Sequence, residues 1–66
     1  MNSFETRFKI LALLVISSDM PKEYQNKIDI VAKAIDRKSQ FALGMLNLVE
    51  KQVINYHECK LLICKN

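Results

Sequence analysis

The stretch IVAKAIDRKSQFALGMLNLVEKQVI, residues 30–54, carries the clearest pattern in the chain. Apolar residues recur in it at intervals of three and four, as they do on one side of an α-helix. A polar segment interrupts this periodicity at residues 36–39, and aliphatic residues dominate after Val53. The pattern predicts a short helix, a tight turn, a longer helix and the beginning of a strand.

The shorter helix is predicted over residues 27–35, with Asn26 as its N-cap. Residues 36–39 are expected to make the turn, in which Asp36 tolerates the left-handed backbone that tight helix-to-helix turns often need. The predicted buried stripe of this shorter helix consists of Ile28, Val31, Ala32 and Ile35.

The longer helix is predicted over residues 39–52, capped by Ser39 or Asp36. Gly44 in its interior costs about 1 kcal/mol relative to Ala, which suggests that a neighbouring element approaches closely there. Glu50 and Lys51 are expected to end the helix with surface charge. The predicted buried stripe consists of Ala42, Met45, Leu46, Val49 and Val53.

A further helix is predicted before this stretch, over residues 4–17. One stripe of it joins Phe4, Phe8, Leu11, Leu14 and Val15 at helical spacing. Its second half is apolar on the other sides too, and a helix that is apolar all round must be covered all round. The helix is therefore a candidate dimer surface, although a small orthogonal bundle that wraps it is the alternative. Residues 17–25 are read as a connection, and the pattern leaves open whether residues 21–26 are helical, because Pro21 can open a helical turn.

The C-terminal segment, residues 53–64, is predicted as two short strands around a turn at His57 and Glu58. The turn contains neither Gly nor Pro. A single continuing helix is the competing interpretation.

Length and composition limit the possibilities. The 66 residues make a single domain, residues 1–66, and a chain of this size buries only about 60% of its unfolded surface. A net charge of +3 fits an anionic partner, although an ordinary solvated surface explains it equally well. Half of the residues are hydrophobic, which favours a dimer or a partner that covers an apolar face.

Two cysteines, Cys59 and Cys64, are too few for a disulfide framework, so a reducing, cytoplasmic location is expected. On one strand they would point to opposite faces and could not bond to each other. The apolar run at residues 10–16 is shorter than the ~20 residues that cross a bilayer, so no membrane partner is predicted. This run resembles the apolar part of a signal peptide, but Glu5 lies where that segment should be basic.

The order helix, helix, turn, helix, two strands resembles the winged helix-turn-helix superfamily. The runs IVAKAI, ALGMLNLVEK and VINY carry the likeness to MarR-like regulators and to the very small fimbrial regulators of the PapI/FaeA type. The family pattern aligns with this sequence without a gap at six residues: Ala32, Ala42, Leu46, Leu48, Glu50 and Lys51. The resemblance implies a mainly α fold with a small β-hairpin, a three-helix winged helix-turn-helix.

It also implies a small transcriptional regulator that binds double-stranded DNA as a dimer or beside a larger regulatory protein. In such folds the third helix enters the major groove, where Gln and Asn can pair with adenine and Leu can meet a thymine methyl group. Basic residues at the helix start and in the wing, with His57, would hold phosphates. The expected DNA-binding residues are Arg37, Lys38, Ser39, Gln40, Leu43, Asn47 and Lys60.

Two alternatives remain open. Phe41, Leu43 and Leu48 are apolar where a DNA reader would carry charge, which favours a protein-interaction module or an antagonist that keeps the fold without binding DNA. A plain three-helix interaction protein without a wing is the other alternative. No catalytic residue, cofactor or metal is predicted. The sequence contains one His, no Gly-rich phosphate-binding loop and no nucleophile–base pair from which an active site could be built. His57, Cys59 and Cys64 lack the paired spacing of a zinc site, and are expected to be a turn residue and two buried thiols.

Overall fold

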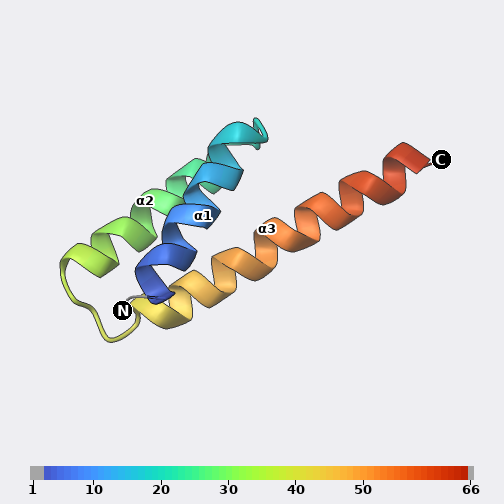
Figure 1. The fold of residues 1–66 in the computed structure, drawn as a ribbon. Coiled ribbons are helices and arrows are strands. Elements are labelled where there is room, and N and C mark those ends of the chain that lie inside the picture. The colour runs from blue at the N-terminus through green and yellow to red at the C-terminus, as the bar shows by residue number, and fades with distance from the viewer. Residues whose placement is uncertain (1–2, 66) are drawn as a thin grey trace.

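The protein consists of three helices in the part of the chain that the structure, a computed structural model, describes: the backbone of residues 3–65 and the side chains of residues 3–61. They are α1 (Ser3–Ser17), α2 (Lys22–Asp36) and α3 (Ala42–Lys65). Figure 1 shows α1 and α2 side by side, with α3 passing them and continuing outward to the C-terminus. Each helix contacts both of the others.

One apolar core joins the three helices. Its fully buried centre is formed by Val15, Val31, Leu46 and Val53, and no polar or charged side chain is buried among the described residues. The stripes predicted for α1 and α3 supply most of this core, which confirms their helical periodicity. Leu11, Met20, Ile28 and Val49 complete the buried cluster.

Helix α2 is longer than predicted, because it begins directly after Pro21. The φ of −51° that the proline ring imposes suits a helix start, and the Tyr24 N–H donates to the Pro21 carbonyl at 3.0 Å. The Tyr24 ring also contacts the Tyr56 ring, with 5.4 Å between centroids, so α3 stabilises the first turn of α2. Asn26 is therefore an interior residue of α2, and the prediction that it caps the helix is wrong.

The turn between α2 and α3 differs from the prediction in one residue. Asp36 ends α2, and Lys38 adopts the left-handed conformation, with φ of 54°. Ser39 does act as a cap, because its Oγ accepts the Phe41 N–H at 3.1 Å and its carbonyl accepts the Ala42 N–H at 3.2 Å. Helix α3 then starts at Ala42, three residues later than expected.

The predicted β-hairpin at residues 53–64 is wrong, and with it the winged helix-turn-helix fold. Helix α3 runs without interruption to Lys65, and residues 3–65 contain no strand. Val53 is buried and Tyr56 packs against the core, so the helical spacing of the inner face continues past the expected helix end. Neither Gly nor Pro stops the helix there. The competing interpretation, one continuing helix, is confirmed.

Three further inferences from the sequence concern Gly44, the end of α3 and a membrane-spanning helix. A Cβ atom built on Gly44 would meet no atom within 4 Å, so the close approach expected there is absent. Glu50 and Lys51 lie in the middle of α3 and do not end it. Searching the described helices for one long and apolar enough to cross a membrane finds none.

Candidate interaction surfaces

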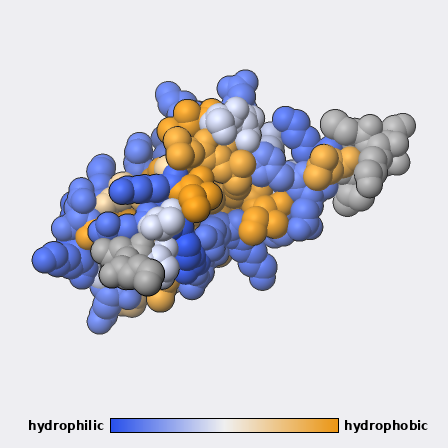
Figure 2. Space-filling model, in the orientation of Figure 1, coloured by the Kyte–Doolittle hydropathy of each residue, from blue (hydrophilic) through white to orange (hydrophobic). Residues whose placement is uncertain are grey.

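Helices α1 and α3 share an exposed apolar surface, which we call the α1/α3 face and define by Ile10, Leu14 and Ile54. Between 38% and 61% of each of these side chains is exposed. Ile10, Leu14 and Ile54 line a groove of about 270 Å³ whose floor is formed by Leu11 and Val53. Figure 2 shows hydrophobic residues gathered over α1 and the neighbouring part of α3.

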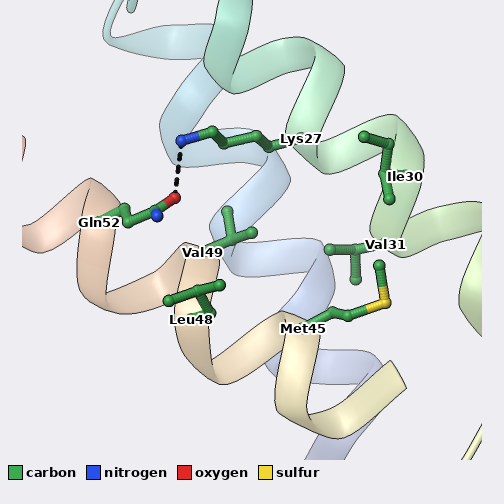
Figure 3. Close-up of a pocket in the computed structure, with 7 residues that line it drawn as sticks. All are labelled: Lys27, Ile30, Val31, Met45, Leu48, Val49 and Gln52. Atoms are coloured by element: carbon green, nitrogen blue, oxygen red, sulfur yellow. Dashed lines mark hydrogen bonds between the residues drawn. The ribbon is translucent and has the colours of Figure 1, made fainter. Parts of the chain in front are cut away.

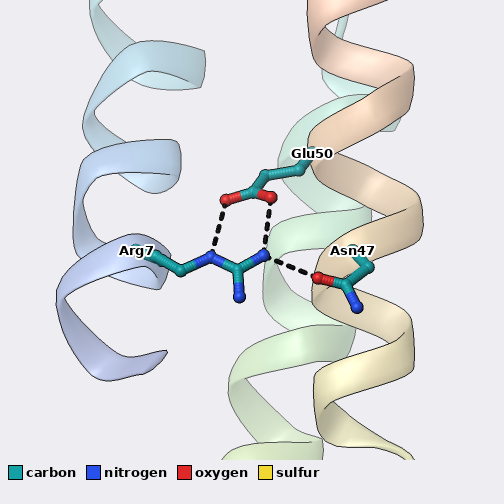
Figure 4. Close-up of polar contacts among 3 residues, drawn as sticks. All are labelled: Arg7, Asn47 and Glu50. Carbon is teal, nitrogen blue, oxygen red and sulfur yellow. Dashed lines mark hydrogen bonds and ion pairs between the residues drawn. The ribbon is translucent and has the colours of Figure 1, made fainter. Parts of the chain in front are cut away.

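A polar cluster closes one end of this face. The Arg7 guanidinium donates from Nε to Glu50 Oε2 at 3.2 Å and from Nη2 to Glu50 Oε1 at 2.7 Å (Figure 4). Its Nη2 also donates to Asn47 Oδ1 at 2.6 Å. The hydrogen bond to Glu50 raises the pKa of Arg7 above its ordinary value, so the charged form is retained. This cluster fixes α1 against the first half of α3.

A second apolar surface lies in the groove between α2 and α3. We call it the α2/α3 groove. Its walls are Ile30, which is 53% exposed, and Leu48, which is 58% exposed, and its floor includes Val31 and Val49. Lys27 Nζ donates to Gln52 Oε1 at 2.8 Å across one end, as Figure 3 shows.

The α2/α3 groove continues toward the turn, because Ile30 and Met45 also line the adjoining hollow with Lys33 and Arg37. Three cationic side chains therefore border the apolar floor: Lys27, Lys33 and Arg37. No acidic residue lines either hollow among the described residues. The groove thus combines an apolar floor with a rim of one charge sign.

The residues predicted to bind DNA do not all lie together in the structure. Six of them, residues 37–40 with Leu43 and Asn47, lie in the turn and the first turns of α3, and five are exposed while Ser39 is half-buried. Asn47 is not free to read a base, because its Oδ1 accepts the Arg7 hydrogen bond. Lys60 lies seventeen residues beyond Leu43 on the same helix, about 26 Å away at 1.5 Å per residue. Without a wing, Lys60 and His57 do not join the other residues.

Sequence reasoning missed the cationic rim of the α2/α3 groove and the Arg7 cluster. Lys27 is the first residue of the helix predicted over residues 27–35, and Lys33 lies on the surface of that helix. No local sequence pattern relates either residue to Leu48. Glu50 was expected to be a solvated helix end. The contacts that give these residues a role join helices far apart in sequence, so periodicity within one helix carries no sign of them.

His57 and Cys59 also differ from the expectation. His57 is half-buried in α3, where its ring meets the Tyr56 ring edge-on with 5.6 Å between centroids, and it is not a turn residue. Cys59 is exposed rather than buried. The side chain of Cys64 lies outside the described residues. Among the side chains that the structure describes, no group of His, Cys, Asp and Glu is placed to hold a metal ion.

Comparison with known proteins gives no relative. No family model matches the chain, and neither a curated protein nor a solved structure matches it.

Proposed function

We propose that this protein is a non-catalytic interaction module whose α2/α3 groove binds an amphipathic helix of another protein, one that carries acidic residues beside its apolar stripe. The observation that carries this proposal is the apolar lining of the groove, which includes Ile30, Met45 and Leu48, beside a cationic rim. The rim consists of Lys27, Lys33 and Arg37. A helix laid into such a groove buries apolar side chains at intervals of three and four. Acidic flanks on that helix complement the rim and steer the encounter.

The first test uses a labelled helical peptide with Leu at the helical intervals and Glu on both flanks, titrated in fluorescence anisotropy. Leu48→Asp places a charge on the groove wall, so we expect at least about a tenfold loss of affinity, since one buried Leu contributes about 1.5–3 kcal/mol. Leu13→Asp is the matched control, because Leu13 is similarly exposed, at 66% against 58%, but lies on α1 and does not line the groove. It should bind as the wild type does.

The charge of the rim is tested with a second peptide in which Lys replaces Glu. We expect the Lys-flanked peptide to bind more weakly than the Glu-flanked one, and the difference to shrink as salt screens the charges. Equal binding of the two peptides, or equal loss in Leu48→Asp and Leu13→Asp, would show that the groove is not the binding site.

Binding to duplex DNA is the second candidate function, and the exposed cations Lys33, Arg37 and Lys38 at the turn favour it. A DNA complex held by these residues must weaken as salt rises, because phosphate contacts release counterions. The double variant Arg37→Ala with Lys38→Ala should weaken binding to all duplex sequences alike, and Gln40→Ala should alter preference among sequences.

Leu48→Asp separates the two functions. It should weaken peptide binding at least about tenfold and reduce DNA binding little, because Leu48 lies in the groove and not at the cationic turn. Anisotropy of a mixed-sequence duplex at low and physiological salt provides the measurement. If no binding occurs at low salt, DNA is excluded as the partner.

A further inference from the structure

The last turns of α3 extend beyond the bundle. The buried positions of α3 end at Val53, and residues 58–61 are all exposed. At 1.5 Å per residue the 24 residues of α3 span about 36 Å, whereas the 15 residues of α1 or α2 span about 22 Å. Figure 1 shows this end of α3, coloured red, clear of the other helices. We call residues 58–65 the arm.

The dimensions of the molecule reflect this extension. Its radius of gyration is 12.6 Å, whereas a compact domain of this length is expected near 11 Å. The longest extent, 43 Å, is about twice the next, 23 Å. The bundle therefore leaves α3 with a length of helix that packs against neither α1 nor α2.

The α1/α3 face continues onto the arm. Leu61 follows Ile54 by seven residues, so both lie on the same side of α3, and Leu61 is 63% exposed. On α1, Ile10 and Leu14 line the groove beside Ile54. An apolar surface thus extends from the bundle to the arm.

Two charges flank Ile54 on α3 at almost equal distances. Lys51 precedes it by three residues and Glu58 follows it by four, and both side chains are exposed. Neither has a residue of opposite charge three or four positions away in the helix, where intrahelical ion pairs form. Among the described side chains the ion pair is that of Arg7 with Glu50, which leaves Lys51 and Glu58 unpaired.

From these observations we propose that the α1/α3 face binds a second copy of this chain, with the two α3 helices antiparallel and the twofold axis passing near Ile54. In this arrangement Lys51 faces the partner's Glu58, and the same pair forms again on the other side of the axis. A parallel arrangement would set Lys51 against Lys51 and Glu58 against Glu58, which is unfavourable. The charges therefore select the antiparallel arrangement.

A dimer of this kind requires only a small fraction of the surface of the chain. A standard interface buries about 800 Å² on each partner, which is about one-seventh of the 5181 Å² accessible surface of this chain. Two long helices in antiparallel contact, flanked by α1 of each copy, provide an apolar centre with charged edges. This dimer uses a different surface from the proposed peptide groove, so either can exist without the other.

Sedimentation equilibrium under reducing conditions, over a wide range of protein concentration, tests the proposal. We expect a monomer–dimer equilibrium for the wild type. Lys51→Glu alone and Glu58→Lys alone should each weaken the dimer about tenfold, since two pairs change in every dimer. The double variant with both changes should return to the wild-type dissociation constant, because it restores both pairs with their signs exchanged.

Cysteine cross-linking locates the axis independently. In a chain carrying Cys59→Ser and Cys64→Ser, Ile54→Cys should form a disulfide-linked dimer under mild oxidation. Leu48→Cys is the matched control: it is similarly exposed, at 58% against 51%, but lies about 120° away around α3, in the α2/α3 groove. It should link far more slowly.

A chain that stays monomeric at every concentration overturns the proposal, as does a double variant that is weaker than either single variant. Equal cross-linking at residues 48 and 54 also overturns it. None of these results bears on the peptide groove, which is tested by Leu48→Asp on its own. Conversely, loss of the peptide interaction leaves the sedimentation result unchanged.

Discussion

Single residues in this protein take their roles from what surrounds them. Met20 lies in the link between α1 and α2, where a solvated residue is the usual choice, yet only 3% of its surface is exposed. Lys38 adopts a left-handed backbone in place of Asp36, although Asp is better suited to that conformation. Gly44 lies in open space rather than at a close contact. In each case residue type alone predicts a different environment from the one observed.

Gly44→Ala should stabilise the protein by about 1 kcal/mol. Alanine loses less conformational entropy in a helix interior, and its Cβ would contact nothing within 4 Å. Urea denaturation followed by circular dichroism measures the change in free energy of unfolding. A loss of stability in a dilute monomer would contradict the open environment of this glycine.

Among the helices, residues 53–64 show how tertiary packing selects between two local structures. The segment contains residues that suit strands, among them Val53 and Tyr56, and β-propensity alone favours the hairpin. Their spacing of three also continues the inner face of α3. Because Val53 completes the core and Tyr56 meets Tyr24, the helix gains packing energy that a hairpin in this chain would lose.

Asn55→Pro tests the continuity of α3. Proline in a helix interior removes one hydrogen bond and clashes with the preceding turn, at a cost of about 3 kcal/mol or more. That is a large part of the stability expected for a chain of this size, so helicity measured by circular dichroism should fall markedly. Asn55→Ala, which keeps the helix, serves as the control because Asn55 is exposed. Unchanged helicity in the proline variant would contradict an unbroken helix.

The whole molecule combines a small core with two exposed apolar surfaces, one between α1 and α3 and one between α2 and α3. A chain of 66 residues buries too little surface to be very stable alone. Association through either surface removes apolar area from water and adds to the stability of the folded state. The elongated shape and the exposed side chains both leave apolar area in water, and association through either proposed surface would cover part of it.

The midpoint of thermal unfolding should rise with protein concentration, by up to about 5 °C for each tenfold increase when dimer dissociation and unfolding are coupled. Ile54→Asp should remove this dependence, because it places a charge near the proposed axis. Differential scanning calorimetry at several concentrations measures both. A midpoint independent of concentration in the wild type would show that unfolding is not linked to association.

Periodicity along the chain was enough to define most of the helical segments and most of the core. The spacing of Leu11 and Val15, of Ile28 and Val31, and of Leu46, Val49 and Val53 predicts which sides of the helices are buried, because helical periodicity is a local property. The start of α2, the length of α3, the Arg7–Glu50 pair and the cationic rim of the α2/α3 groove depend on the tertiary structure. Each of these arises from contacts between helices, and a pattern read along one helix does not contain the position of the next.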